Sequence, residues 1–174
     1  RQVYKMTPCR ILMLLPFVVE GALSIGIARA LRARGMEITI AFCGDASSVY
    51  TVDPMADFET TGDLIQLSGR TSLQRLQLIH ELIVERKIGL IVQIGAAELY
   101  PLLPYWKERV PQVQIVDTLY NEFGHTLNHF LYEACIDAVI VESNFMREFV
   151  RRSTRKPYSR IDVLHNGVDL NEFS

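Results

Sequence analysis

The sequence has no run of apolar residues long enough to cross a bilayer. Its most apolar segment, from Ile11 to Val19, is short and contains Pro16, whereas a membrane-spanning helix needs about 20 apolar residues. A basic segment followed by a small-residue cleavage site is also missing. We therefore expect a cytoplasmic protein, and because the chain begins at Arg1 rather than Met, we expect an excerpt of a longer one.

Cysteine is scarce, and its pattern argues against a disulfide framework. The three cysteines, Cys9, Cys43 and Cys135, are odd in number and widely spaced, without the pairing of ligands typical of a metal site. This usage suits a reducing compartment. We expect the three side chains to be small core residues.

Net charge is also low, at −2, which gives no overall attraction to nucleic acid. The charges are unevenly distributed, however. Residues 45–63 hold five acids and no Lys or Arg, whereas residues 147–160 hold six bases and one acid. An anionic acceptor or a membrane surface would meet the second stretch through Arg147, Arg151 and Arg152, and the alternative is an ordinary solvated surface.

Four catalytic fingerprints are missing as well. Gly21 and Gly26 alone do not make the G-x-G-x-x-G of a dinucleotide site, and Ile27-Ala28 stands where a P-loop needs Lys and Ser or Thr. His125 and His129 lack the Glu of H-E-x-x-H and an evident third ligand, so we predict no metal. Ser143 lacks the G-x-S-x-G elbow of hydrolases.

Apolar segments that read as strands alternate with segments of helical periodicity along the whole chain. The expected strands lie within 9–17, 36–42, 63–67, 88–95, 112–117, 137–143 and 160–165, and the expected helices within 22–35, 72–87, 123–136 and 144–152. The crossover within 97–110 is expected to be helical or irregular and to be broken by Pro101 and Pro104. Because parallel strands need long crossover connections, this alternation predicts a mostly parallel sheet with helices on both faces. Residues 1–174 therefore form one Rossmann-like α/β/α sandwich.

Ligands of such sheets gather beyond the carboxyl ends of the strands, where we place the candidate site. Glu20, Gly21 and Ala22 precede the first helix, whose unpaired backbone N–H groups can receive an anion or a hydroxyl-rich ligand; alternatively, Gly21 only permits the tight turn. Gly95 follows the fourth strand. Ser143 is expected as a helix N-cap that also faces the cleft.

The loop after the fifth strand is the most polar in the sequence and suits a polyhydroxylated ligand or a proton transfer. We predict catalytic roles for Asp117 and His125 and ligand binding by Tyr120, Asn121 and Glu122. At the other end of the chain, Asn166 and Gly167 form a turn after the last strand. Gly167 tolerates a positive φ there, and Asn166 is expected to face the cleft.

Two segments, "CIDAVIVESNFMREFV" and "IDVLHNGVDLNEF", resemble the family 4 glycosyltransferases of GT-B fold, over nearly the whole chain. The resemblance implies that this chain is the amino-terminal, acceptor-side domain. A missing carboxyl-terminal domain would bind the nucleotide-sugar donor, and transfer would retain the anomeric configuration. Neither a metal nor any cofactor beyond the donor co-substrate is implied, and the isolated domain is expected to be inactive.

The sequence departs from the family pattern at two places. Glu20-Gly21-Ala22 stands where members often have a Gly-Gly-x-Glu-like loop that contacts the donor phosphate. Leu119-Tyr120-Asn121-Glu122 stands where many have His-Asp, so Asp117, Asn121 or His125 would substitute. The implied acceptor is a sugar or a lipid-linked molecule. A non-catalytic module that binds a sugar, lipid phosphate or protein is the alternative, and a stand-alone nucleotide-binding or sugar-epimerising enzyme is a third.

Overall fold

The computed structural model describes residues 9–19, 22–44 and 55–167, which form a seven-stranded, wholly parallel sheet. Its strands are β1 (Arg10–Leu15), β2 (Glu37–Phe42), β3 (Leu64–Gln66), β4 (Leu90–Gln93), β5 (Gln114–Leu119), β6 (Ala138–Val141) and β7 (Ile161–Val163). Their order across the sheet is β3-β2-β1-β4-β5-β6-β7. Strands β2 and β3 are added on one side of β1, and β4 to β7 on the other, so the strand order reverses between β1 and β4. Ligands of such sheets bind at this point. The predicted fold class is confirmed.

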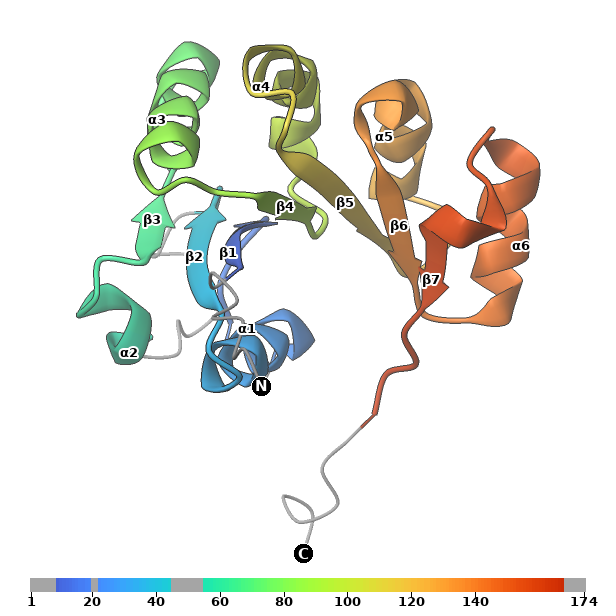
Figure 1. Ribbon diagram of the computed structural model, residues 1–174, viewed down its shortest axis with the longest axis horizontal. Coiled ribbons are helices and arrows are strands. Elements are labelled where there is room, and N and C mark those ends of the chain that lie inside the picture. The colour runs from blue at the N-terminus through green and yellow to red at the C-terminus, as the bar shows by residue number, and fades with distance from the viewer. Residues whose placement is uncertain (1–8, 20–21, 45–54, 168–174) are drawn as a thin grey trace, which may run out of the picture.

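The helices divide unequally between the two faces of the sheet (Figure 1). They are α1 (Leu23–Ala33), α2 (Ala56–Glu59), α3 (Ser72–Glu85), α4 (Leu103–Arg109), α5 (His125–Tyr132) and α6 (Asn144–Ser153), with short 3₁₀ turns η1 (Ala97–Leu102), η2 (Glu133–Cys135) and η3 (Tyr158–Arg160). One face carries α3, α4, α5 and α6 side by side, and the other carries α1 and α2. Among the described residues, no helix covers β5, β6 and β7 on the α1 side.

This inequality appears in the burial of alternate residues along β6. Val139 and Val141 point toward α3–α6 and have no exposed surface, whereas Ala138 and Ile140 on the opposite face are only partly buried. The apolar core accordingly forms two clusters, one on each face. The larger contains Leu12, Ile91, Trp106, Ile115 and Val150, and the smaller contains Met13, Ile25, Ile40, Met55 and Phe58.

Local sequence signals account for where two of the helices begin. The Thr71 hydroxyl accepts a bond from the Gln74 backbone N–H at 3.2 Å, and the Gln74 side chain accepts one from Thr71 N at 2.9 Å. This reciprocal capping box satisfies two backbone donors at the start of α3. Ser143 caps α6 through Met146 N at 3.2 Å. Both predicted caps are confirmed.

Several local predictions need correction. Strand β5 continues to Leu119, so Asp117 lies inside it and does not begin the following loop. Pro104 stands in the first turn of α4, where a missing N–H costs nothing, so it starts a helix instead of breaking one. Of the cysteines, only Cys43 is buried; Cys9 is exposed and Cys135 is intermediate. Gly167 does not adopt a positive φ.

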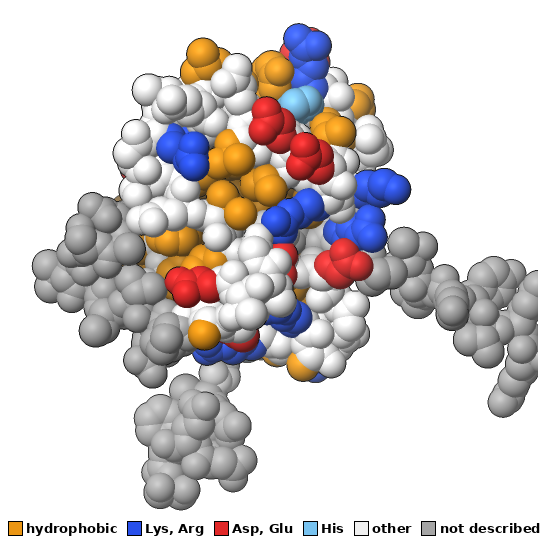
Figure 2. Space-filling model, turned by 90° about the vertical axis from the view of Figure 1, so that its left-hand side faces the viewer, with side chains coloured by type: hydrophobic (Ala, Val, Ile, Leu, Met, Phe, Trp, Pro, Cys, Tyr) orange, Lys and Arg blue, Asp and Glu red, His pale blue; other side chains and the backbone are white. Residues whose placement is uncertain are grey.

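Charged pairs flank the edge strand β3. Figure 2 shows this side of the molecule, where hydrophobic side chains gather in the middle and charged groups lie around them. Asp63, directly before β3, accepts bonds from Arg86 at 2.7 Å and Arg32 at 3.2 Å. Charged groups beside a short edge strand discourage pairing with another chain.

The inequality of the two faces leads to a prediction for neighbouring residues of β6. We expect Val139→Ala to lower the free energy of unfolding by about 2 kcal/mol, because it opens a cavity in the covered core. Ile140→Ala removes a larger side chain, yet we expect a loss of about 1 kcal/mol or less because Ile140 is already partly hydrated. Urea unfolding of the two variants measures the difference, and an equal or larger loss for Ile140→Ala would contradict the assignment of the faces.

Candidate functional site

A cavity of about 330 Å³ lies at the carboxyl edge of the sheet, between the ends of β1, β4 and β5. Residues from three loops and the first turn of α1 line it: Leu15, Pro16, Phe17, Ala22, Leu23, Ser24, Ile94, Gly95, Tyr120 and His125. This is the point between β1 and β4 where the strand order reverses, which is the ligand site expected for this fold. Of the predicted site residues, it brings together Ala22, Gly95, Tyr120 and His125.

His125 has one ring nitrogen in use and the other free. Its Nε2 lies 3.1 Å from the backbone oxygen of Thr118. Because a carbonyl oxygen can only accept, Nε2 carries the proton, and in the neutral ring Nδ1 is then a bare acceptor. The site therefore holds an imidazole in a fixed tautomer.

Gly95 shapes the space beside that acceptor. Its φ is +74°, a conformation that side chains disfavour, and a Cβ atom added there would lie 3.5 Å from His125 Nδ1. Glycine thus meets the needs of the turn and keeps the space next to the imidazole open. This gives a physical reason for the predicted place of Gly95 in the site.

Tyr120 supplies a hydrogen-bond donor next to His125. The two rings meet edge to face with their centroids 6.5 Å apart. Burial, and secondly the negative charge of Glu142, raise the pKa of the Tyr120 hydroxyl. The phenol therefore stays protonated at neutral pH and can donate to a ligand oxygen.

The third side of the cavity is the start of α1. Its N-cap residue, Ala22, has no side chain that caps the helix, and the first turn contains no acidic residue. The N-terminal backbone groups and the partial positive charge of the helix therefore face a region lined by Ser24. Glu20 and Gly21, which we predicted to bind ligand here, lie outside the described residues.

Asp117 does not line the cavity. Its side chain is fully buried on the opposite face of β5, where its two oxygens accept bonds from Tyr100 Oη at 2.8 and 3.0 Å, Thr118 N at 2.9 Å and His129 Nδ1 at 2.8 Å. Burial, and secondly this carboxylate, raise the pKa of Tyr100. We had expected Asp117 to contact substrate, but the geometry makes it a positioning residue beneath the loop that carries Tyr120 and His125.

The remaining predicted residues lie around the cavity without lining it. Asn121 is exposed, and its side chain accepts a bond from Phe123 N at 2.9 Å, which shapes the loop. Glu122 is half-buried, and Ser143 is occupied as the cap of α6. Asn166 and Gly167 are exposed beyond β7.

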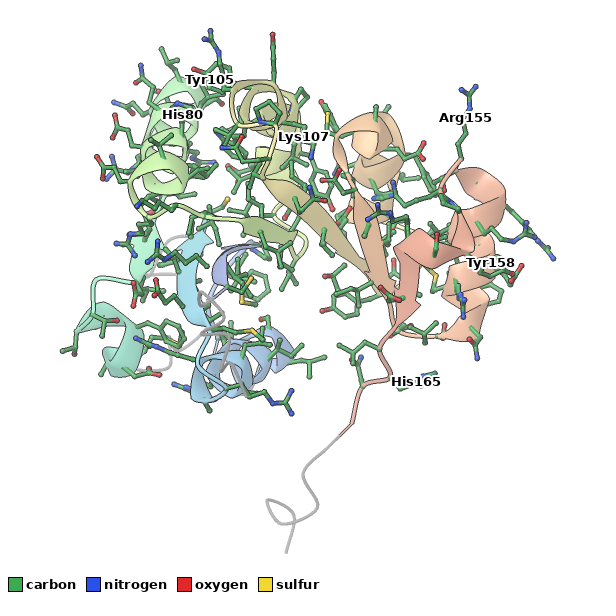
Figure 3. All side chains as sticks on the ribbon, viewed as in Figure 1. His80, Tyr105, Lys107, Arg155, Tyr158 and His165 are labelled. Atoms are coloured by element: carbon green, nitrogen blue, oxygen red, sulfur yellow. The ribbon has the colours of Figure 1, made fainter. Side chains whose placement is uncertain are left out.

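The end of β7 is fastened to the end of β6 through His165. Its Nδ1 lies 3.0 Å from Glu142 O, and Figure 3 shows His165 where the chain leaves the sheet. Asn166 and Gly167 follow directly, so they extend away from the cavity's walls.

The two histidines of α5 face different partners. His129 is buried against Asp117, whereas His125 faces Gly95 and the cavity. Within the described ranges, no group of three or more His, Cys, Asp and Glu side chains is arranged to hold a metal ion. Likewise, no helix of the described part has the length and hydrophobicity that a bilayer crossing requires.

The sequence prediction missed the apolar walls of the cavity. Pro16, Phe17 and Ile94 directly follow strand ends, Leu23 begins α1, and Phe17 is 46% exposed. Their position was visible in the sequence, but their apolar character suggested core. A large aromatic group directly after a strand, at the sheet's ligand edge, was the available signal.

A larger hollow, of about 600 Å³, lies at the opposite edge, beside the start of β2. Its Arg10 is paired with Glu37 at 2.7 Å, and Arg32 and Arg86 are paired with Asp63. Because these cations are already neutralised and the strands begin here, we place the functional site at the other edge.

These features define a Rossmann-like domain with a candidate site at the carboxyl edge of its sheet. A family model described as Glycosyltransferase Family 4 matches residues 24–172. The chain therefore belongs to Glycosyltransferase Family 4. No curated protein matches it.

Solved structures share the fold at low sequence identity. UDP-GlcNAc 2-epimerase from Methanocaldococcus jannaschii has a TM-score of 0.64 at 13% identity, over 90% of this chain and 45% of that one. MurG from Acinetobacter baumannii has a TM-score of 0.55 at 10% identity, with coverages of 93% and 47%. Arabidopsis thaliana UGT89C1, complexed with UDP-L-rhamnose, has a TM-score of 0.56 at 13% identity, with coverages of 92% and 49%. The chain thus spans about half the length of these proteins.

The position of Asp117 predicts a structural effect of its removal. Asp117→Ala would leave three buried donors without an acceptor, so we expect it to lower the free energy of unfolding by about 3 kcal/mol. Tyr100→Phe removes one donor, and we expect a loss of about 1 kcal/mol. Urea unfolding tests both, with exposed Asp162→Ala as the matched control. If Asp117→Ala were as stable as Asp162→Ala, the buried carboxylate would not be a structural centre.

Proposed function

We propose that this chain is the acceptor-side domain of an enzyme that transfers a sugar from a nucleotide-sugar donor, with retention of configuration. Membership of Glycosyltransferase Family 4 supports sugar transfer. The cavity lies where the strand order reverses, and this position supports ligand binding by this domain. The natural protein that carries the chain would work in the cytoplasm on a sugar or lipid-linked acceptor.

The observation that carries the acceptor-side assignment is the composition of the cavity. Among the described residues that line it, none is Lys or Arg, and the polar side chains are Ser24, Tyr120 and His125. A nucleotide diphosphate carries negative charge that proteins usually meet with cations or several backbone donors. A neutral, hydroxyl-bearing ligand needs only a few hydrogen bonds and apolar contact with its ring faces, which these residues offer.

In this proposal, His125 and Tyr120 hold the acceptor. His125 Nδ1 accepts a bond from the acceptor hydroxyl that attacks the sugar, and its fixed tautomer keeps that nitrogen available. Tyr120 donates to a neighbouring acceptor oxygen. Pro16 and Phe17 pack against the apolar side of the acceptor. Holding a nucleophilic oxygen in a fixed direction contributes to rate by itself, because orientation is otherwise lost as entropy.

The donor would be bound mainly by a second domain. Two of the similar solved structures hold UDP-sugars: the M. jannaschii epimerase, also described in complex with UDP-GlcNAc and UDP, and the A. thaliana enzyme with UDP-L-rhamnose. Those proteins are about twice as long as this chain, which supports a two-domain enzyme. No other cofactor is proposed, and the chain alone is expected to show no transfer.

The test is nucleotide-sugar turnover by the natural protein that carries this chain. We expect His125→Ala to lower kcat/KM for the acceptor by about 10–100-fold, because the hydroxyl loses its acceptor group. Donor affinity, measured by calorimetry, should stay within about twofold. The matched control is His80→Ala: His80 lies on α3 and packs against Tyr105 with ring centroids 5.7 Å apart (Figure 3), away from the cavity.

Two results would count against the proposal. A protein that binds no common nucleotide sugar would be a binding module without transferase chemistry, which is the alternative. An equal loss of rate in His125→Ala and His80→Ala would remove His125 from the site while leaving the transferase assignment intact.

A further inference from the structure

Helices α5 and α6 expose an apolar surface that neither the core nor the cavity uses. Phe123, Leu127, Leu131 and Phe145 are 73%, 59%, 77% and 65% exposed. We call this surface, together with the groove described next, the α5–α6 face. Residues 123, 127 and 131 are spaced by four, so they lie along one side of α5 and its approach. The side of α5 that faces the sheet is formed by other residues, which are buried.

A groove continues this surface across α6. It has a volume of about 490 Å³ and is lined by Asn144, Phe145, Glu148, Phe149 and Arg152. Phe149 reaches α5, where its ring lies 5.9 Å from that of Phe130. Through this contact the groove on α6 adjoins α5, so the exposed apolar side chains gather on two neighbouring helices, and such a gathering marks an interaction site.

The charges around the face are mainly positive. Arg152 lines the groove and has no hydrogen bond or ion pair with another described residue, and the Arg155 side chain points away from the fold (Figure 3). Of the acids nearby, Glu148 pairs with Arg151 at 3.2 Å and Glu133 lies 3.9 Å from Lys156 Nζ, whereas half-buried Glu122 has no ion pair with another described residue. Among the described residues, Arg152 is thus an unpaired cation in the same groove as Phe145 and Phe149, and Arg155 follows it just after the end of α6.

Two of the three arginines predicted to meet an anionic partner have another role. The guanidinium groups of Arg147 and Arg151 lie over the ring of Tyr158, at 4.7 and 5.2 Å from its centre. These contacts fasten the segment that follows α6 to the helix. Of the predicted three, Arg152 makes no such contact with another described residue, and Arg155 joins it as a candidate.

We propose that the α5–α6 face docks on an anionic lipid bilayer. Exposed Phe and Leu side chains enter the boundary between headgroups and acyl chains, and Arg152 and Arg155 meet the anionic headgroups. Charge complementarity selects this partner, because a second copy of the chain would bring its own arginines against these and repel.

Docking in this orientation would place the cavity near the membrane. Phe123 lies two positions before His125, and Phe145 begins α6 just after β6, so the face starts at the same edge of the sheet as the cavity. An acceptor held in the bilayer would then reach the cavity from the membrane surface. This last step rests on the proposed function, whereas docking itself does not.

Vesicle sedimentation of this protein tests the docking. We expect binding to phosphatidylcholine vesicles that contain about 30% phosphatidylglycerol, at least about tenfold tighter than to phosphatidylcholine alone, and weakened at about 1 M salt. The double variant Leu127→Ser/Leu131→Ser should bind about tenfold more weakly. Its matched control is Leu73→Ser/Val84→Ser, because Leu73 and Val84 are also exposed but lie on α3.

A second pair of variants isolates the charges. Arg152→Ser/Arg155→Ser should reduce anionic binding and its salt dependence, whereas Arg34→Ser/Arg70→Ser, which changes exposed arginines elsewhere, should not. Equal losses in test and control variants would overturn the proposal, as would binding that ignores lipid charge. Concentration-dependent dimers that Leu127→Ser/Leu131→Ser abolishes, seen by analytical ultracentrifugation without vesicle binding, would assign the face to a second copy and also overturn it.

Discussion

The structure depends on a carboxylate that has no contact with water. Asp117 lies on β5, an interior strand of the sheet, and a carboxylate is costly to bury unless its oxygens are hydrogen-bonded. Its partners come from three separate elements: Tyr100 from η1, the backbone of β5 itself, and His129 from α5. One buried group therefore fixes how a crossover turn, a strand and a helix sit relative to one another. Any movement of α5 would leave at least one buried polar group without a partner.

This constraint reaches the cavity through a few covalent bonds. Thr118, the residue after Asp117, offers its backbone oxygen to His125 Nε2 on the ligand side. His125 and His129 lie one helical turn apart on α5 and bond to neighbouring residues of β5. His129 bonds to Asp117 in the core, and His125 bonds to Thr118 at the cavity. The orientation of the His125 imidazole at the cavity is set by its bond to Thr118 O, next to Asp117 in the same strand, so the ring is held in place without a ligand.

The fold was predictable because its signals are local. Apolar runs without alternation marked strands buried on both sides, and Thr71 and Gly35 marked helix ends. The site was predictable only in part. Sequence position placed Ala22, Gly95, Tyr120 and His125 at the edge where the cavity lies, but it could not show that Asp117 points into the core. That choice depends on the alternation along a strand that ends two residues later than its apolar pattern suggested, and on a tyrosine contributed by another crossover.

The unequal covering of the sheet gives a reason why exposed apolar side chains and a basic border occur together on α5 and α6. Four helices cover one face, and the last two, α5 and α6, stand at the sheet's far side, where fewer neighbours cover their outer surfaces. Their exposed Phe and Leu side chains are therefore not needed by the core and cost solubility. If selection retained these side chains for binding, they would need a basic border, and the α5–α6 face would need to begin beside the cavity. The same loop, between β5 and α5, would then link recognition of a surface to recognition of an acceptor.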